Sequence, residues 1–283
     1  MSGPGGITVI KIGGSTLEDV GRLGTLWRAI AEASSGSGGR SGRGLVLVHG
    51  GGKAVDSLLG RLGMPVERRD GLRVTPKDQI GIVAGVLRGE VNAMLVGAFN
   101  AAAAGAGVAS RAVGLCLGDG GMVECRRASE ALGCVGEVME GEGGGGVLRV
   151  LLAAGYVPVV SSIGMGADGG LLNINADDAA SGIARVLGAT RLVLLTDVEG
   201  VRGADGAVVP TLTPASAGRL IEAGVVKGGM AVKVRSALSA AQKTGAKVVI
   251  LSGEGPGPLA AYISGEKVGT EIVGHDDGPG GVA

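Results

Sequence analysis

The chain has very few aromatic side chains: one Trp, one Phe and two Tyr among 283 residues. Proteins that bind single-stranded nucleic acids stack bases on aromatic residues, and those that bind duplexes carry an excess of basic residues. This chain has neither, because its 26 Lys and Arg are balanced by 26 Asp and Glu. We therefore expect no nucleic-acid partner, and a core built from Val, Leu, Ile and Ala.

The sequence is also poor in the side chains that many enzymes use as metal ligands or nucleophiles. It has only two histidines, and its three cysteines, Cys116, Cys125 and Cys134, form no CxxC pair. Zinc sites need closely spaced Cys and His ligands, so we predict no protein-bound metal. An odd number of scattered cysteines fits a reducing cytoplasm better than a framework of disulfide bonds.

Signals for export, for membrane insertion and for two common nucleotide-binding motifs are missing as well. Met1–Gly6 carries no basic residue and no run of 18 apolar residues occurs, so we expect neither a signal peptide nor a membrane span. The P-loop pattern GxxxxGK[ST] does not occur. Gly164–Gly169 has the spacing GxGxxG, but a strand, Leu171–Ile174, follows in place of a helix, so we predict a hairpin turn there.

Glycine is abundant, with 59 residues, and several glycines stand directly after predicted strands. The first such strand is Ile7–Ile12, which contains Lys11 and runs into Gly13 and Gly14. A lysine inside a buried strand is unusual unless it is paired, and glycines let backbone N–H groups approach an anion closely. This combination suits a phosphate; the alternative is an edge strand whose lysine is solvated.

The second strand of this kind is Leu45–His49, which is followed by Gly50–Gly52 and by a helix predicted from about Lys53 to Leu62. A strand, a glycine turn and a helix N-terminus together place backbone N–H groups around an anion. The alternative is a tight turn that binds nothing.

A long helix is predicted next, with Thr75 as its N-cap, Pro76 in its first turn and its end at about Ala104. Arg73 then lies in a loop just before the helix. A guanidinium at such a place can hold a substrate carboxylate through two parallel hydrogen bonds. The alternative is an ordinary surface arginine.

Polar residues also follow the strand Leu171–Ile174. Asn173 and Asn175 share one face of the extended chain, and a helix is predicted from there to Leu187. Asp177 either caps this helix or orients neighbouring ammonium groups. Lys233 stands early in another predicted helix, Met230–Lys243.

The alternation of strands and helices predicts an α/β fold, a three-layer sandwich with a mainly parallel sheet between helices. We expect one domain over 7–273, with 1–6 and the tail 274–283 disordered and a flexible loop at Ser34–Gly44. We also expect a hairpin between Val108–Leu117 and Met122–Arg126. The remaining predicted strands are Val157–Ile163, Arg191–Thr196, Ala246–Leu251 and Thr270–Val273.

Eight stretches together resemble the motifs of the amino acid kinase family, in family order and over nearly the whole chain. They are KIGGS (Lys11–Ser15), LVLVHGGG (Leu45–Gly52), DGLRVTPKDQI (Asp70–Ile80), AVGLCLGDG (Ala112–Gly120), PVVSSIG (Pro158–Gly164), NINADDAA (Asn173–Ala180), LLTDVEGV (Leu194–Val201) and GGMAVKV (Gly228–Val234). DGLRVT and NINAD point to the branch that phosphorylates N-acetyl-L-glutamate.

The resemblance implies a role for each site residue. Lys11 and Lys233 would stabilise the transferring phosphoryl group, and Asp177 would hold both lysines in place. The substrate-binding residues would be Gly51, Gly52, Arg73 and Asn173. The nucleotide-binding residues would be Gly13, Gly14, Asp197, Val198, Glu199, Gly200, Val201, Arg202, Val225, Val226 and Lys227.

The activity implied is ATP-dependent phosphorylation of the γ-carboxylate of N-acetyl-L-glutamate, the second step of arginine biosynthesis. ATP would bind to about 176–273, the acyl substrate to about 7–175, and Mg²⁺ would be carried by the nucleotide. A carboxylate is already anionic, so such a reaction needs fixed cations and no general base. Two alternatives stay open: a related acyl kinase with another substrate, and a non-catalytic metabolite-binding member of the family.

The resemblance also implies a homodimer. The apolar stripe of the helix predicted from Thr75 to about Ala104 is longer than one core needs, and this region pairs subunits in the resembling enzymes. Arginine-inhibited members are hexamers that join dimers through a helix before the first strand. Met1–Gly6 is too short and too rich in Gly, Ser and Pro for such a helix, so we expect no inhibition by arginine.

Overall fold

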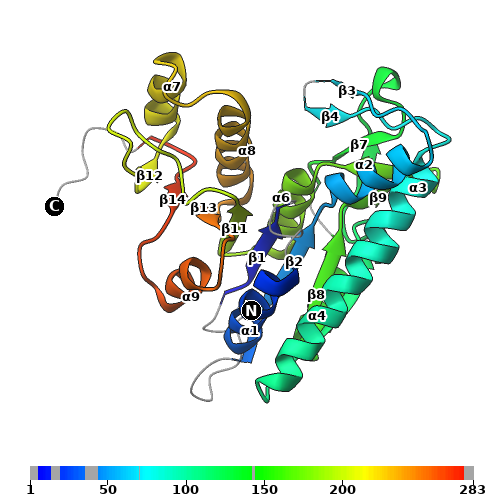
Figure 1. The fold of residues 1–283 in the computed structure, drawn as a ribbon, viewed down its shortest axis with the longest axis horizontal. Helices are drawn as coiled ribbons and strands as arrows, with labels where there is room; N and C mark the ends of the chain where they lie inside the picture. The colour runs from blue at the N-terminus through cyan, green and yellow to red at the C-terminus, as the bar shows by residue number, and fades with distance from the viewer. Residues whose placement is uncertain (1–5, 14–19, 36–43, 70, 142–143, 277–283) are drawn as a thin grey trace.

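The molecule is built around an eight-stranded sheet in the computed structural model, which describes residues 6–13, 20–35, 44–69, 71–141 and 144–276. The strand order is β12-β14-β13-β11-β1-β2-β8-β5, and every neighbouring pair is parallel except β13 and β14. Figure 1 shows β1 in the middle, between β11 and β2. The bounds are β1 Thr8–Ile12, β2 Leu45–His49, β5 Arg111–Cys116, β8 Tyr156–Ser161, β11 Arg191–Thr196, β12 Thr211–Leu212, β13 Lys247–Ser252 and β14 Thr270–Ile272.

Helices cover both faces of this sheet, which confirms the predicted three-layer sandwich. Alternate residues of β1 point to opposite faces. Ile10 and Ile12 join a core with Trp27 of α1 (Val20–Ser35), whereas Val9 joins a second core with Ile183 of α6 (Ala176–Leu187). The helices that share the first core are α1, α2 (Gly52–Arg61), α4 (Asn92–Gly105) and α9 (Gly257–Ser264); those that share the second are α5 (Gly146–Ala153), α6, α7 (Pro214–Glu222) and α8 (Gly228–Thr244).

Two smaller sheets flank the large one. A four-stranded sheet has the order β6-β7-β10-β9, and β3 pairs with β4 as a hairpin. β9 and β10 are antiparallel, and the Gly166 N–H donates to the Gly170 carbonyl at 2.8 Å, so the glycine-rich stretch between them is a hairpin turn as predicted. The bounds are β3 Arg68–Arg69, β4 Leu72–Arg73, β6 Cys125–Arg127, β7 Val135–Val138, β9 Ile163–Met165 and β10 Leu171–Ile174.

The hairpin predicted between Val108–Leu117 and Met122–Arg126 is wrong. β5 pairs in parallel with β8 along its whole length, and the Gly118 N–H beyond it donates to the Ile163 carbonyl. A short 3₁₀ turn, Asp119–Gly121, then takes the chain into the four-stranded sheet, where β6 pairs with β7. The two segments therefore belong to different sheets.

The long helix is present but starts later than predicted, and Thr75 is not its N-cap. Thr75 is buried; its N–H donates to the Leu132 carbonyl and its carbonyl accepts from the Cys134 N–H. These bonds hold Thr75 in a β-bridge, so the helix can begin only after a turn. It consists of α3 (Ile80–Ala84), a π-helical segment η1 (Gly85–Val91) and α4, which Figure 1 shows running beside β8.

By length and composition alone, one segment of the described chain, Ile80–Gly105, could cross a membrane. Of its most apolar window, 44% is buried inside this fold, where α4 packs on α1 and on the sheet. A core helix of a soluble protein passes the same test, and the burial on the sheet explains the apolar composition here.

Several expectations fall on residues outside the described ranges: those for 1–5, for Gly14, for most of the Ser34–Gly44 loop and for 277–283. Ser34 and Ser35 belong to α1. The predicted disordered tail begins too early, because Asp276 accepts a hydrogen bond from the Ala215 N–H at 3.0 Å. Gly274 lies so close to the end of α8 that an added Cβ would come within 2.8 Å of the Gln242 nitrogen.

Candidate active site

The candidate site lies where β1, β2 and β11 end side by side. Ile12, the last residue of β1, is level with His49 at the end of β2 and with Leu195 near the end of β11. The carboxyl ends of neighbouring parallel strands are the usual ligand sites of α/β proteins, because loops and helix N-termini converge there. Gly13 directly follows β1, and Gly50–Gly52 directly follow β2, at this edge.

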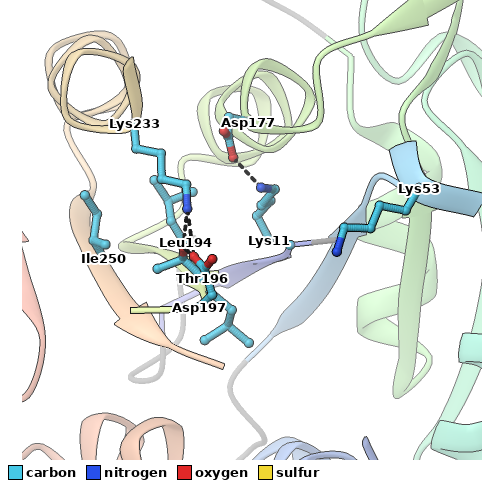
Figure 2. A pocket seen from close by; sticks show the side chains of 10 residues that line it. Lys11, Lys53, Asp177, Leu194, Thr196, Asp197, Lys233 and Ile250 are labelled. Atoms are coloured by element: carbon cyan, nitrogen blue, oxygen red, sulfur yellow. Dashed lines mark hydrogen bonds and ion pairs between the residues drawn. The ribbon is translucent and has the colours of Figure 1, made fainter. Parts of the chain in front are cut away.

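A cavity of about 260 Å³ at this edge is lined by three lysines and two aspartates. Figure 2 shows the side chains of Lys11, Lys233 and Lys53 directed toward it from β1, α8 and α2. With Asp177 and Asp197 in the same lining, the cavity carries one more positive than negative group. Such an excess favours an anionic ligand.

Lys11 and Asp177 form an ion pair of 2.9 Å, and their side chains are only 16% and 23% exposed. Asp177 is in the first turn of α6, but Asn175 is the N-cap, since its side chain accepts from the Asp177 N–H at 2.7 Å. Asp177 is therefore not the cap, which was one of its two predicted roles. Its carboxylate is left to orient the Lys11 ammonium.

Lys233 pairs with a different carboxylate from the one predicted. Its ammonium donates to the Thr196 hydroxyl and lies 3.2 Å from Asp197, whereas Asp177 is paired with Lys11 alone among the described contacts. The Thr196 hydroxyl in turn donates to Asp197 at 2.8 Å. These hydrogen bonds, from Thr196 first and from Lys233 second, lower the pKa of the Asp197 carboxyl.

Two of the predicted glycines have a steric reason to be glycine. A Cβ at Gly13 would lie 2.8 Å from the Leu195 carbonyl oxygen of the neighbouring strand. Gly51 has a φ of 157°, and a Cβ there would lie 2.7 Å from Leu87 of the π-helical segment. Neither Gly13 nor Gly51 therefore has room for a side chain, and Gly13 also lines the cavity.

The predicted substrate residues are linked to one another, and Arg73 is not a surface arginine. It is the last residue of β4, is buried, pairs with Asp56, and donates to the Gly52 carbonyl at 2.8 Å. The Asn173 amide donates to the Thr75 hydroxyl at 3.0 Å, and that hydroxyl donates to the Arg73 carbonyl. Gly52, Arg73 and Asn173 are thus brought together from α2, β4 and β10.

The charge of Arg73 is balanced inside the protein. Burial by itself raises the pKa of the Asp56 carboxyl, but hydrogen bonds from Arg73 and Arg68 outweigh burial and hold that pKa below its usual value. Asp56 therefore stays ionised beside Arg73. A substrate carboxylate at Arg73 would have to use the guanidinium N–H groups that Asp56 and Gly52 do not occupy.

The predicted nucleotide residues are more dispersed. Asp197 lines the cavity, whereas Glu199 lines a separate cavity of about 910 Å³ on the α9 side of the sheet. Val201 is buried and its N–H donates to the Thr270 hydroxyl, and Arg202 forms an ion pair with Glu199.

Gly13 lines the first cavity together with Asp197, whereas Val198, Gly200, Val225, Val226 and Lys227 do not. Gly200 packs against Thr270 and Val208, and Val198 is half-buried beside it. The Val225 and Val226 N–H groups both donate to the Leu220 carbonyl at 3.0 Å, and Lys227 is the N-cap residue of α8.

Sequence reasoning missed Lys53 and Thr196. Lys53 is the second residue of α2, directly after the triple glycine, and lines the same cavity as Lys11. That position, one residue into a helix that starts at an anion-binding turn, was a usable signal. Thr196 gave no such signal, because a threonine at the end of a strand is common.

Comparisons with known proteins agree with this geometry. Residues 6–252 match the model of the amino acid kinase family. The chain is 44% identical to the acetylglutamate kinase of Edwardsiella ictaluri, and 42% identical to that of Colwellia psychrerythraea. Both alignments cover 93% of this chain, with 98% and 95% of the two relatives. A carbamate kinase from Giardia has the same fold, with a TM-score of 0.69 at 17% identity over 96% of this chain and 100% of that one. The chain therefore belongs to the amino acid kinase family.

Proposed function

We propose that the protein transfers the γ-phosphoryl group of ATP to the γ-carboxylate of N-acetyl-L-glutamate, giving N-acetyl-L-glutamyl 5-phosphate in the second step of arginine biosynthesis. The observation that carries the proposal is the cavity where β1, β2 and β11 end, which holds Lys11, Lys233 and Lys53 against two aspartates. The similarity to acetylglutamate kinases over 93% of the chain supports the choice of substrate.

The chemistry fits a site that has cations and no general base. The attacking carboxylate is already ionised, so the main obstacle is repulsion between it and the phosphate, together with charge on the transferring group. Lys11 and Lys233 approach the cavity from opposite sides, as Figure 2 shows, and can neutralise that charge without moving far. Gly13, which lines the cavity, and Gly51, in the turn after β2, would offer backbone N–H groups that do the same.

The parts of N-acetyl-L-glutamate that do not react, its α-carboxylate and its acetamido group, would bind near Gly52, Arg73 and Asn173. Arg73 is nearly inaccessible to solvent and is held by Asp56 and Gly52, so its orientation is fixed before a ligand arrives. The side-chain amide of Asn173 has both a hydrogen-bond donor and an acceptor, as the acetamido group of the substrate does. We place the nucleotide on the other side of the cavity, between Asp197 and the N-terminal part of α8.

Mg²⁺ belongs in this proposal as a companion of the nucleotide. Mg²⁺ sites in kinases commonly use one or two carboxylates together with the phosphates of the substrate. The cavity offers Asp177 and Asp197, and no cluster of three or more His, Cys, Asp or Glu side chains occurs in the described residues. When bound, the ion neutralises phosphate charge, while the residues of the chain hold and orient the reactants.

We also propose that two copies of the chain form a symmetric dimer through the exposed side of the helix Ile80–Gly105. That side carries small residues four apart, Gly81, Gly85, Gly89, Ala93, Gly97 and Ala101, all exposed. Small residues let two helices approach closely.

The three described free cysteines and the need for ATP support a site of action in the reducing cytoplasm.

The substrate is tested by trapping the acyl phosphate with hydroxylamine in the presence of Mg-ATP. We expect a hydroxamate signal with N-acetyl-L-glutamate and little with free glutamate, aspartate or carbamate. A Lys11→Ala variant serves as the control for contaminating kinases and should give almost no signal. A clear preference for one of the other substrates would refute the choice of N-acetylglutamate, and no turnover with any of them would favour a non-catalytic binding protein.

A further inference from the structure

His49, one of only two histidines in the chain, stands directly before the glycine turn and plays no part in the mechanism above. It is the last residue of β2, its side chain is completely buried, and its Nδ1 lies 2.7 Å from the Gly50 carbonyl oxygen. The ring therefore contacts the first peptide group of the turn that leads to Gly51 and Gly52.

Asn92 fixes which ring nitrogen carries the proton. Its Nδ2 lies 2.9 Å from the His49 Nε2, 2.9 Å from the Val159 carbonyl and 3.4 Å from the Leu115 carbonyl. Carbonyl oxygens can only accept, so the atom that faces them must be the amide nitrogen, which can only donate. The His49 Nε2 is therefore an acceptor without a proton, and the proton is on Nδ1, where it donates to Gly50.

The surrounding structure is shaped for this contact. Gly114 of β5 lies so close to the Asn92 amide oxygen that a Cβ at that position would collide with it. Asn92 itself is buried and directly follows the π-helical segment Gly85–Val91, whose Leu87 and Val91 pack against Gly51. π-helical segments are rare and are frequent at functional sites. One element thus contacts both the histidine and the glycine turn.

We propose that His49 and Asn92 are positioning residues that aim the Gly51 N–H at the reacting carboxylate or phosphoryl group, an inference that rests on the proposed function. The carbonyl and the N–H of one trans peptide point in opposite directions, and no cis peptide occurs in the described chain. Holding the Gly50 carbonyl toward the buried ring therefore directs the Gly51 N–H away from it. Glycine turns rotate easily, so a fixed peptide plane preorganises the donor.

Burial supports this role, because it lowers the pKa of His49 to about 4, so the ring is neutral at physiological pH. A protonated ring would carry a second N–H at Nε2, directed at the Asn92 amide nitrogen, and would break the network. A neutral ring with one fixed tautomer keeps the donor to Gly50 at neutral pH.

Two substitutions of His49 separate positioning from simple packing. The amide nitrogen of His49→Asn can occupy the place of Nδ1 and donate to Gly50, whereas that of the longer His49→Gln reaches only the place of Nε2. We expect His49→Asn to keep kcat within about threefold of the wild type, and His49→Gln to lose about tenfold or more, with the KM for ATP unchanged in both. Equal kcat values in the two variants, whether both high or both low, would overturn the proposal.

The tautomer is measured separately on the unmodified protein by nitrogen-15 NMR of the imidazole rings, with a His275→Ala variant to assign the two histidines. We expect His49 to carry its proton on Nδ1 and to show no titration between pH 5 and 8. A proton on Nε2, or titration near pH 6.5, would refute the network. A wild-type protein without kinase activity would refute the proposed function instead, since the spectrum does not depend on turnover.

Discussion

At the scale of single residues, the charges of Lys11 and Lys233 account for most of the chemistry proposed here. We predict that Lys11→Ala or Lys233→Ala lowers kcat by about 10²–10³-fold, as expected for the loss of one preorganised electrostatic group. The thermal midpoint should change little in Lys233→Ala, whose ion pair is 39% and 56% exposed, and more in Lys11→Ala, whose ion pair is 16% and 23% exposed. ADP release under saturating substrates measures the effect. A variant that loses less than threefold would exclude that lysine from the reaction.

The two lysines should differ in their dependence on their carboxylate partners. Lys11 and Asp177 are 16% and 23% exposed, whereas Lys233 and Asp197 are 39% and 56% exposed, and exposed ion pairs contribute little. We therefore expect Asp177→Asn to reduce kcat clearly more than Asp197→Asn does. The same assay compares these isosteric variants, and the reverse order would show that Asp197 is the residue that organises the site.

His49 gives a prediction about stability and pH. Its pKa is about 4 in the folded protein and 6.5 in an unfolded chain, so the unfolded state binds more protons between these values. Stability is therefore complete above pH 6.5 and falls as the pH drops toward 4. When the pH is lowered from 7 to 5, we expect the titration of His49 to reduce the free energy of unfolding by about 2 kcal/mol. Urea unfolding of wild type and His49→Asn at both pH values measures it, and equal pH dependence in the two would contradict the buried neutral ring.

At the scale of elements, the local sequence pattern was enough to predict those strands whose apolar run and following turn lie next to each other in the sequence. β1, β2, β8, β10, β11, β13 and β14 occur within a few residues of their predicted bounds, because apolar runs that end in glycine or a polar turn have few alternatives. The placement of Lys11 at the cavity also followed from its own strand.

Prediction failed where a distant residue decides the local structure. Thr75 has the sequence signal of an N-cap, but Asn173, 98 residues away, donates to its hydroxyl, and Cys134 donates to its carbonyl. Lys233 was assigned to Asp177 by resemblance, and the nearer Asp197 holds it in this structure. The π-helical segment before Asn92 has no local signature, and it packs against α2 and β5, contacts that only the fold provides.

β4 and α2 are joined through Arg73, which gives a prediction at this scale. We expect Arg73→Lys to raise the KM for N-acetylglutamate by about tenfold and to leave the KM for ATP unchanged, because one ammonium cannot replace the planar set of donors to Asp56, Gly52 and a carboxylate. Arg73→Ala should have the same kinetic effect and also lower stability, since Asp56 then keeps only Arg68 and the Gly52 carbonyl loses its donor. Initial rates with each substrate varied in turn measure both constants. A change confined to the KM for ATP would place Arg73 on the nucleotide side.

At the scale of the whole molecule, the site is assembled from both ends of the chain. Lys11 comes from the first strand, Asp177 and Lys233 come from helices more than 160 residues later, and the sheet brings them together because β1 is its central strand between β2 and β11. Helices on both faces cover much of the sheet, and the cavity with the three lysines lies at the strand ends. The fold class could be predicted from the alternation of strands and helices, whereas the strand order that creates the cavity could not.

The exposed side of the helix Ile80–Gly105 gives the last prediction. An added Cβ at Gly97 meets nothing within 4 Å in the single chain, so a larger side chain is tolerated by the protomer itself. If two such helices pack closely in a dimer, however, Gly97→Arg must separate them. By light scattering we expect the wild type to have a molar mass of twice 27.5 kDa and the variant to have the mass of a single chain. The circular dichroism spectra of the two proteins should be the same.

Gly60→Arg is the matched control for that experiment, because Gly60 is also an exposed helical glycine whose added Cβ would meet nothing within 4 Å. It lies on α2, outside the helix Ile80–Gly105, and should leave the dimer intact. A glycine in an exposed helix costs about 1 kcal/mol relative to alanine, and a close helix contact would offset that cost for the glycines along Ile80–Gly105. A monomeric wild type, or a Gly97→Arg variant that stays dimeric, would show that this side of the helix is not the interface.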